Sequence, residues 1–294
     1  MKRLLFLSFF AVGVSSAFAQ NLYSNQSSNV NVAQLNAVSV AGNGTAAPSG
    51  GLWSECQTDG SGFANTSAGF TVTPGTTATS FRLADDFTIS GAAWNVTGVR
   101  VYAYQTGQTV MPFNGGSLNI WSGAPNAGGS IVATGTFGSG NGAIQVDAAG
   151  NTASIFRVFN TTIPGTSGGG LTAPGTTRRV WEITFNVNAS LSAGTYWIDY
   201  QLTATNAGTA FAPSTTHQGV RGVTGANAMQ WNGTTWVTPI NDTGQPVGGA
   251  VTPPVFAQEM PFIVSGSVVP EPASMAALGL GVLAVVRRRR QKKS

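Results

Sequence analysis

The residue types that most often carry catalysis are scarce in this chain. His217 is the only histidine and Cys56 is the only cysteine among the 294 residues. A Ser-His-Asp triad would need a serine held on a sharp strand-to-helix turn, and the body shows no helical pattern that would form one. A structural zinc site uses four ligands, mostly Cys and His, which these two side chains cannot supply. We therefore expect His217 to lie in a loop and Cys56 to be buried.

Asp85 and Asp86 form the only adjacent pair of carboxylates in the chain. Neighbouring side chains on a strand point to opposite faces of the sheet, so adjacency alone does not make a catalytic dyad. At a strand end or a bulge both could join backbone carbonyls around a calcium ion, which takes six to eight oxygen ligands. The interpretation that we favour is structural, with Asp85 facing solvent or an arginine and Asp86 bonding turn amides. A calcium site stays open as the alternative, and no other cofactor is expected.

The remaining carboxylates raise the question of glycoside hydrolysis, which uses two carboxyl groups about 5–9.5 Å apart. None of them lies in a motif that pairs it with another, so the sequence designates no catalytic residue. We expect a protein that is not an enzyme, and a hydrolase acting on extracellular polysaccharide stays open as an alternative. The candidates by residue type are Glu55, Asp59, Asp147, Glu182, Asp199, Asp242 and Glu259.

A tryptophan on the polar face of a strand is the best candidate for a sugar-binding platform, because its ring offers a flat apolar surface. In the segment TYWIDYQL, Trp197 lies on the face that also carries Asp199 and Gln201. Trp197 and Asp199 are therefore a candidate ligand platform, and a carbohydrate-binding module stays open as a second function. Packing is the interpretation that we favour for Trp197, since large aromatic residues commonly fill β cores.

Segments in which apolar and polar residues alternate must position these side chains. Every second residue of VWEITFNV, from Trp181 to Val187, is apolar, and TYWIDYQL repeats the pattern from Tyr196. This period of two is typical of strands with one face on a core. Segments rich in Gly, Pro and Asn separate them, and Asn232 with Gly233 in WNGTTW predicts a hairpin. We expect an all-β fold, formed as a single jelly-roll-like β-sandwich.

Charge is concentrated at the two ends of the chain. The whole chain has a formal net charge of +4, but residues 20–265 hold six arginines, no lysine and nine carboxylates, a net charge of −3. This body lacks the basic patch by which proteins bind nucleic acids, so we expect no nucleic-acid partner. Charged residues make up 8% of the chain, against about 25% in typical globular proteins. An uncharged polar surface of this kind is compatible with exopolysaccharide as a partner.

The segment MKRLLFLSFFAVGVSSAFA, residues 1–19, has the pattern of a secretory signal peptide. Lys2 and Arg3 precede an apolar stretch of eleven residues, which is too short to span a bilayer as a helix. Ala17 and Ala19 place small residues at the −3 and −1 positions of a cleavage site. We expect signal peptidase to cut after Ala19.

The C-terminus joins three unlike elements: the letters VVPEP, a short apolar run and a basic cluster. Pro270, Glu271 and Pro272 cannot continue a regular helix or a paired strand. Residues 273–286 are apolar or small, and as a helix they would extend about 21 Å, a marginal transmembrane span for a hydrocarbon core about 30 Å thick. We expect an exported body whose tail stays transiently in the inner membrane, because clustered basic residues resist translocation. The basic cluster begins with four arginines, Arg287, Arg288, Arg289 and Arg290.

This C-terminal arrangement resembles the PEP-CTERM sorting signal of exported Gram-negative bacterial proteins, a region that is sometimes labelled an ice-binding protein C-terminal domain. The resemblance covers residues 268–294 and implies processing by an exosortase in the region of Pro270, Glu271 and Pro272. An exosortase is therefore the implied partner during export. After processing, the resemblance implies a place at the cell surface or outside the cell.

The chain thus divides into a signal peptide (residues 1–19), an Asn- and Ser-rich lead-in (20–50), a β-sandwich domain (51–265) and the sorting signal (268–294). The sorting signal comprises the motif 270–272, the transmembrane segment 273–286 and the basic tail 287–294. The function that we expect is that of an exported cell-surface or extracellular-matrix-associated protein with no catalytic activity.

Overall fold

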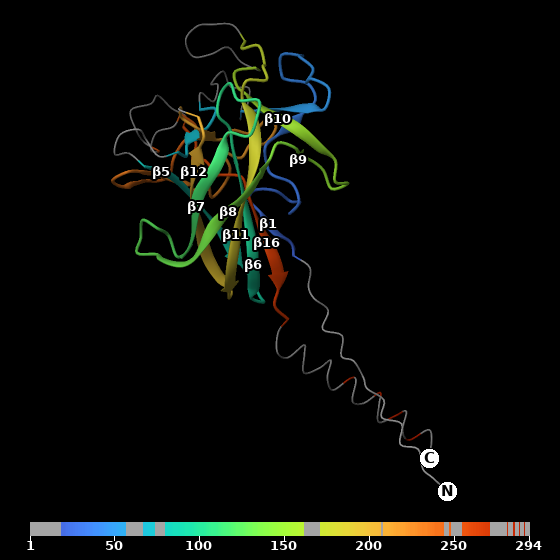
Figure 1. Ribbon diagram of the computed structural model, residues 1–294, viewed down its shortest axis with the longest axis vertical. Helices are drawn as coiled ribbons and strands as arrows, with labels where there is room; N and C mark the ends of the chain where they lie inside the picture. Colours follow the sequence, from blue (N-terminus) through green and yellow to red (C-terminus); the bar gives the residue numbers. More distant parts are fainter. Residues whose placement is uncertain are drawn as a thin grey trace.

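The computed structural model describes residues 19–56, 67–73, 80–161, 171–206, 208–243, 247, 255–270, 281, 285, 288 and 291. Apart from the helical positions 281, 285, 288 and 291, this part of the chain consists of strands and the loops between them, which confirms the expected all-β class (Figure 1). No helix within it is both long enough and apolar enough to cross a bilayer. In chain order the strands are β1 (Gln20–Ser24), β2 (Ala37–Val38), β3 (Gly51–Glu55), β4 (Phe70–Thr71), β5 (Phe81–Ile89), β6 (Trp94–Ala103), β7 (Phe113–Ser122), β8 (Ser130–Asn141), β9 (Ile144–Gln145), β10 (Thr152–Val158), β11 (Arg179–Leu191), β12 (Gly194–Ala204), β13 (Phe211–Ala212), β14 (Met229–Asn232), β15 (Trp236–Val237) and β16 (Phe262–Val268).

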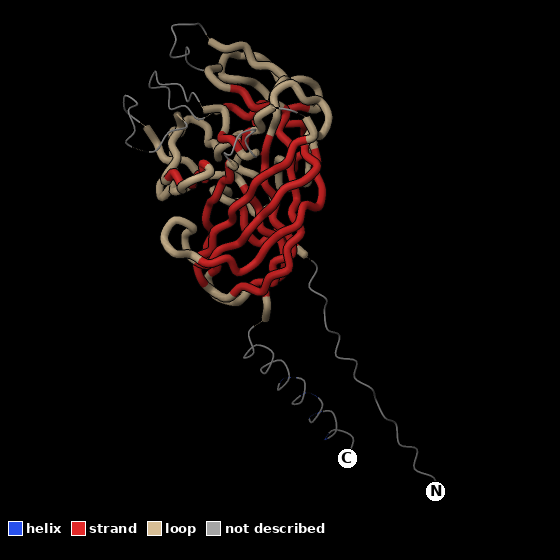
Figure 2. Tube along the Cα trace, turned by 60° about the vertical axis from the view of Figure 1, so that its left-hand side comes forward, coloured by secondary structure: helices blue, strands red, loops and turns tan. Residues whose placement is uncertain are grey.

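Fourteen of these strands join in one sheet, while β4 and β13 form a separate pair. Hydrogen-bonded neighbours follow the order β1-β16-β6-β11-β8-β7-β12-β5-β14-β15, and β10 connects β3, β2 and β9 to β11. Neighbours are antiparallel except β3 and β10, which run parallel. Figure 2 shows the long strands side by side in a curled arrangement. The pairing therefore forms one large curled sheet and does not divide the body into the two separate sheets that a sandwich would have.

Breaks in the strand register help the sheet to curl. The pairing of β11 with β6 shifts between Asn186 and Ala189, and that of β16 with β6 shifts between Ser265 and Gly266. An extra residue on one strand increases the local twist and bends the sheet. At Gly266 a Cβ atom would lie 2.1 Å from the carbonyl oxygen of Asn95, so this close approach of the two backbones requires glycine.

The predicted period of two is confirmed on the inner face of β11 and β12. Ile183, Phe185 and Ile198 are fully buried, and they belong to one core cluster with Leu83 and Val101. Fully burying an aliphatic or aromatic side chain of this size contributes about 1.5–3 kcal/mol. The core therefore forms without a disulfide, and Cys56 is free and buried as the sequence predicted.

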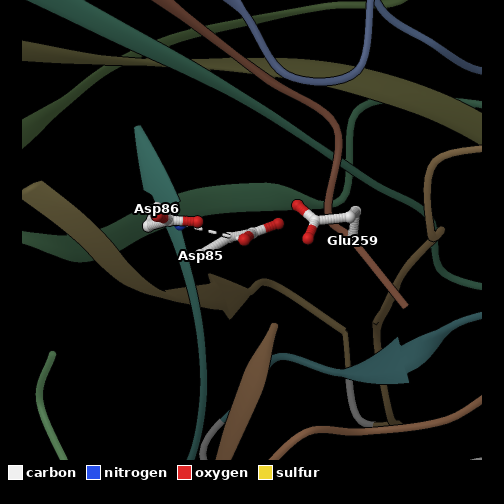
Figure 3. A group of neighbouring side chains, drawn as sticks. All are labelled: Asp85, Asp86 and Glu259. Atoms are coloured by element: carbon white, nitrogen blue, oxygen red, sulfur yellow. Dashed lines mark hydrogen bonds between the residues drawn. The ribbon is translucent and has the colours of Figure 1, made fainter. Parts of the chain in front are cut away.

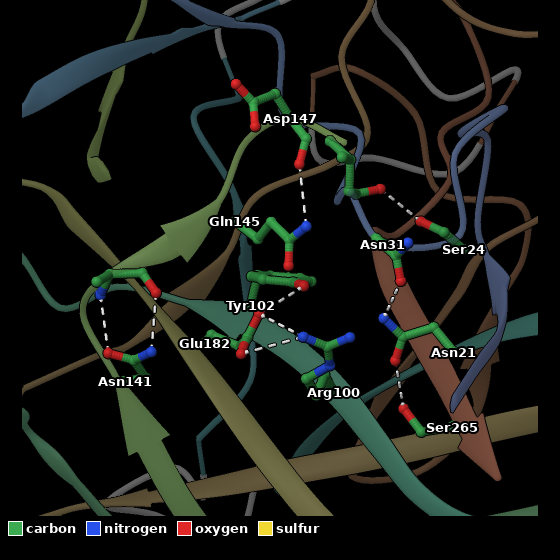
Figure 4. A network of polar contacts seen from close by, with 12 residues as sticks. Asn21, Ser24, Asn31, Arg100, Tyr102, Asn141, Gln145, Asp147, Glu182 and Ser265 are labelled. Carbon is green, nitrogen blue, oxygen red and sulfur yellow. Dashed lines mark hydrogen bonds and ion pairs between the residues drawn. The ribbon is translucent and has the colours of Figure 1, made fainter. Parts of the chain in front are cut away.

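The outer face of the sheet is partly covered as well. Over β6 and β11, Tyr102 packs in a second apolar cluster with Ile144 and Ile155. On the same face Glu182 accepts hydrogen bonds from the Tyr102 hydroxyl at 3.0 Å and from Arg100 at 3.3 Å (Figure 4). Strands in the middle of the sheet are therefore buried on both faces. A strand of a simple sandwich would bury one face and expose the other, so its alternating pattern does not predict this.

The segment 20–50, expected as a lead-in, belongs to the fold. β1 pairs with β16, with Gln20 opposite Gly266, and the ring of Tyr23 lies 5.5 Å from that of Phe262. Leu35 is 2% exposed in the second cluster. These apolar residues are widely spaced among Asn and Ser, so they form no periodic pattern in the sequence. β1 and β16 carry the two ends of the body side by side (Figure 1).

Two sequence predictions fall largely outside the described residues. Of the signal peptide, only Ala19 is described, and it directly precedes β1. Of the predicted transmembrane segment 273–286, only positions 281 and 285 are described.

Candidate functional site

The most unusual chemical grouping in the described residues is a cluster of three carboxylates, Asp85, Asp86 and Glu259 (Figure 3). Asp85 and Asp86 lie in the middle of β5, and Glu259 lies three residues before β16. One carboxylate oxygen from each residue lies within 4.8 Å of the others. Asp85 is fully buried and Glu259 is 3% exposed, whereas Asp86 is half-buried.

Alternation along β5 explains where these side chains point. Asp85 lies on the inner face between Leu83 and Phe87, which are core residues, whereas Asp86 takes the opposite face. Figure 3 shows the Asp85 carboxyl group directed toward Glu259, with Asp86 on the other side of it. Asp85 therefore lies between the other two acids, at the boundary of the apolar core.

Backbone and amide donors surround the Asp85 carboxylate. Its Oδ1 accepts the Asp86 N–H at 2.9 Å, and its Oδ2 accepts the Met260 N–H at 2.5 Å. The Nδ2 of Asn25 donates to the same Oδ2 at 2.9 Å. Asn25 follows β1 and is 2% exposed, so the cluster joins segments from both ends of the body to β5.

Glu259 shares one of these donors. Its Oε2 accepts Asn25 Nδ2 at 2.9 Å, and its Oε1 accepts the Asn227 N–H at 2.9 Å. The carbonyl oxygen of Met260 lies 2.9 Å from the same Asn25 nitrogen. Three oxygen atoms therefore converge on an amide group that has two hydrogens to donate.

Electrostatics at the cluster is unfavourable to full ionisation. Burial raises the pKa of Asp85 well above its usual range, and the charge of Glu259 raises it further. Burial also raises the pKa of Glu259 and that of Asp86. Two buried carboxyl groups in contact cannot both carry a charge unless a proton or a cation lies between them. The arrangement is therefore suited to sharing a proton or to binding a cation.

The sequence interpretation of this pair needs correction. Asp85 does not face solvent or an arginine, because β5 turns it into the core, where it is 0% exposed. Asp86 is held by a residue distant in the sequence and not by turn amides, since its side-chain hydrogen-bond partner is the side chain of Asn227. Sequence reasoning missed Asn25 and Glu259 as members of the group. A carboxylate inside the apolar run VFAQEMPFIV was the available signal for Glu259.

The candidate platform residues Trp197 and Asp199 lie on the outer face of β12. Trp197 is 6% exposed and packs against Ala84 and Met229. It is too well covered to stack on a ligand, so the platform interpretation is wrong for Trp197, and the packing that we favoured is confirmed. The covering residues include Trp121 of β7 and Trp236 of β15.

Asp199 is an acceptor at the centre of a polar network. It is 1% exposed and forms an ion pair with Nε of Arg82. Its Oδ2 accepts hydrogen bonds from Asn119 Nδ2 and Trp121 Nε1, both at 2.9 Å. The network fixes the ring of Trp121, which is half-buried. Asp199 thus positions neighbouring side chains and does not itself reach a surface ligand.

The predicted WNGTTW hairpin is confirmed and extends this outer face. Trp231 of β14 pairs with Trp236 of β15, and their ring centroids are 5.7 Å apart. Trp231 also pairs with Arg82 in the β14–β5 register. The half-buried rings of Trp121, Trp231 and Trp236 therefore flank the Asp199 network, and we call them the aromatic face.

The other carboxylates proposed by type have structural contacts. Asp242 is buried and pairs with Arg221 at 2.5 Å, and Glu55 is buried and bonds the Thr161 hydroxyl. Asp147 is half-buried and accepts hydrogen bonds from its own turn. His217 lies in a loop, as predicted. Asp59 lies outside the described residues.

The sorting residues begin where the last strand ends. β16 ends at Val268, and Pro270 is exposed. Arg288 is described as helical. The other predicted positions of the sorting and signal-cleavage sites, Ala17, Glu271, Pro272, Arg287, Arg289 and Arg290, lie outside the described residues.

Comparison with known proteins agrees with the C-terminal pattern. Residues 268–290 match the family model of the PEP-CTERM protein-sorting motif. No curated protein matches the chain. The predicted sorting signal is therefore confirmed, and the match begins at Val268, the last residue of β16.

Proposed function

We propose that this chain is an exported protein that an exosortase processes in the region of Pro270 and delivers to the cell surface or the extracellular matrix. The match to the PEP-CTERM protein-sorting motif at residues 268–290 is the observation that carries the proposal. On this view the all-β body is the delivered product, and it acts by binding or packing in its surroundings without catalysing a reaction.

The place of the motif relative to the fold supports this order of events. β16 ends at Val268, so removal of the tail after Pro270 would leave every described strand in place. Gln20, the first residue after the expected signal cleavage, pairs with Gly266. Both processing points therefore lie at the same end of the sheet, and a precursor held there would direct the rest of its body away from the membrane.

The contacts of the carboxylates support a role without catalysis. Asp199, Glu182 and Asp242 each form an ion pair with an arginine. A glycosidase needs one carboxyl group that is free to protonate the leaving group and a second that is free to attack or to activate water. These three carboxylates, held by arginine, do not meet that requirement, and Asp85 and Glu259 are buried away from solvent.

The test is processing in a host that has an exosortase. Replacing Pro270, Glu271 and Pro272 by alanine, or Arg287–Arg290 by serine, should leave the C-terminal segment on the exported protein and keep it in the membrane fraction. Arg178→Ser, a change of the same type in the body, should leave processing intact. Mass spectrometry and fractionation read the result, and identical mature masses and locations in all variants would refute the proposal.

A second function, carbohydrate binding, is favoured by the aromatic face. Partly exposed tryptophans beside fixed polar groups are well suited to sugars, which present apolar ring faces and hydroxyl groups together. Here Trp121, Trp231 and Trp236 surround Asp199 and Arg82. The candidate contact residues are therefore these rings, in place of the buried Trp197.

Affinity electrophoresis in gels containing the producing cell's exopolysaccharide tests this second function. Trp231→Ala should remove the retardation, whereas Trp94→Phe, a substitution on β6 away from the aromatic face, should keep it. A wild-type protein that migrates unchanged at millimolar sugar concentrations would reject carbohydrate binding, without affecting the sorting proposal.

A further inference from the structure

The spacing of Asp85, Asp86 and Glu259 suits one ion. Calcium binds oxygen ligands at about 2.4 Å, so two ligands on opposite sides of an ion are about 4.8 Å apart. One oxygen from each of the three carboxylates falls within 4.8 Å of the others. No backbone movement is needed to bring three anionic ligands around a single point.

The negative charge of this cluster has no basic partner among the described residues. Asp85 and Glu259 are buried, and the ion pairs of the described chain join arginines to Asp199, Glu182 and Asp242 instead. The body contains no lysine. Buried carboxylates in proteins are generally paired with a cationic group or coordinate a metal, so the cluster calls for a counter-charge.

A buried oxygen beside the cluster gives an independent indication of a ligand. Tyr200 is 0% exposed, and its hydroxyl has no hydrogen-bond partner among the residues that the structure describes. Ile198 pairs with Asp85 and Tyr200 pairs with Leu83, so Tyr200 and Asp85 are diagonal neighbours on the inner face. Burial raises the pKa of the Tyr200 phenol, and the nearby charge of Asp85 raises it further.

A second unpartnered oxygen belongs to Asn227, which contacts two of the acids. The backbone N–H of Asn227 bonds Glu259, and its side-chain amide bonds Asp86. The remaining amide oxygen, Asn227 Oδ1, is buried and has no partner within the described part of the chain. Buried polar atoms of this kind are uncommon and usually indicate an ion or a water.

We propose that Asp85, Asp86 and Glu259, together with the oxygens of Tyr200 and Asn227, form a binding site for one divalent cation of the calcium type. Carboxylate, amide and hydroxyl oxygens are hard ligands, and their irregular arrangement suits calcium better than magnesium, which requires a near-ideal octahedron. A half-turn of the Asn25 amide would present its oxygen to the ion, and the Tyr23 hydroxyl, which now donates to that oxygen at 2.8 Å, would then accept from its NH₂ group.

The location of the site gives the ion a structural role. Asn25 follows β1, Asp85 lies in β5 and Glu259 precedes β16. A cation bound there would join both ends of the body to β5. Millimolar calcium outside the cell would then stabilise the protein once it is exported, because a ligand that binds the folded state alone raises its stability.

Thermal unfolding of the full chain in mild detergent, stripped with EDTA, tests the site. Added calcium should raise the melting temperature in proportion to the logarithm of its concentration, and magnesium should raise it much less. Terbium, which substitutes for calcium, should show luminescence sensitised by Tyr23 and Tyr200. Glu259→Gln and Asp86→Asn should remove both responses, and circular dichroism confirms that each variant is folded. Asp147→Asn, which changes a carboxylate outside the cluster, should keep them.

Three results would overturn the proposal. An unchanged melting temperature with calcium would show that a shared proton neutralises the acids. A calcium response that persists in Glu259→Gln and Asp86→Asn would place the ion elsewhere. An equal response to magnesium would exclude a calcium-type site. Because all of these measurements concern the folded body, their failure leaves the sorting proposal untouched.

Discussion

The strongest stability prediction concerns Asp199→Ala. This buried carboxylate accepts an ion-pair contact from Arg82 and hydrogen bonds from Asn119 and Trp121. Removing one partner of a buried ion pair typically costs about 3–5 kcal/mol, and each lost neutral hydrogen bond about 1 kcal/mol. The Arg82 side chain is 19% exposed, so water partly replaces the lost carboxylate. We therefore expect the free energy of unfolding to fall by about 3–4 kcal/mol.

Urea unfolding followed by far-ultraviolet circular dichroism measures this loss. For a protein of this size the melting temperature should fall by roughly 6–16 °C. Asp199→Asn keeps one acceptor oxygen and should lose about half as much. Glu182→Ala is the matched comparison, because its contacts with Arg100 are longer, at 3.3 and 3.4 Å, and it should lose less than Asp199→Ala. An Asp199→Ala variant as stable as the wild type would refute the reasoning that this network holds β12 to its neighbours.

Three further predictions concern other residues. Arg157 is fully buried and donates hydrogen bonds to Ala68, Ser54, Thr216 and Ser214. The ammonium group of Arg157→Lys cannot reach acceptors on several sides, so this variant should lose about 2 kcal/mol of unfolding free energy in urea. No loss would contradict the idea that Arg157 holds these segments together. Gly233 has φ of 95°, so Gly233→Ala should cost about 1 kcal/mol, with Gly175→Ala, which no neighbouring atom restricts, as the neutral control. Burial lowers the pKa of His217 below 6.5; its stabilising contribution is therefore present above pH 6.5 and is lost as the pH falls through the folded-state pKa. An NMR titration of this single imidazole checks the direction, and a value above 6.5 would refute it.

Local patterns predicted those features that depend on neighbouring residues alone. Alternation in β11 and β12 gave the inner face correctly, and Asn232-Gly233 gave the β14–β15 hairpin. These features follow from the pleat and from turn geometry, which a short segment determines by itself. The same alternation failed for Trp197, because a neighbouring hairpin covers the outer face of β12. Which face is covered depends on the topology, and no single strand contains that information.

The carboxylate cluster was beyond local reasoning for a related reason. Asn25 and Glu259 are 234 residues apart, and Asn25 and Asp85 are 60 apart. Their contact depends on β1 and β16 pairing at one place in the sheet. The adjacency of Asp85 and Asp86 identified a position worth attention, but adjacency also suggested solvent exposure. The inward direction of Asp85 follows from the strand register, which only the assembled sheet fixes.

The position of β16 links the order of export to the order of folding. This strand lies between β1 and β6, and its register with β6 extends from Phe262 to Val268. The sheet is therefore incomplete until residue 268 has crossed the membrane, two residues before Pro270. Because a pairing between such distant segments forms only after both are present, cleavage in the region of Pro270 would act on a body that can already be folded. A truncation after residue 261 should remove this last pairing and leave the edge of β6 open. Limited proteolysis of the exported product should then cut within β1 and β6. Resistance equal to that of the wild type would show that β16 is dispensable for completing the fold.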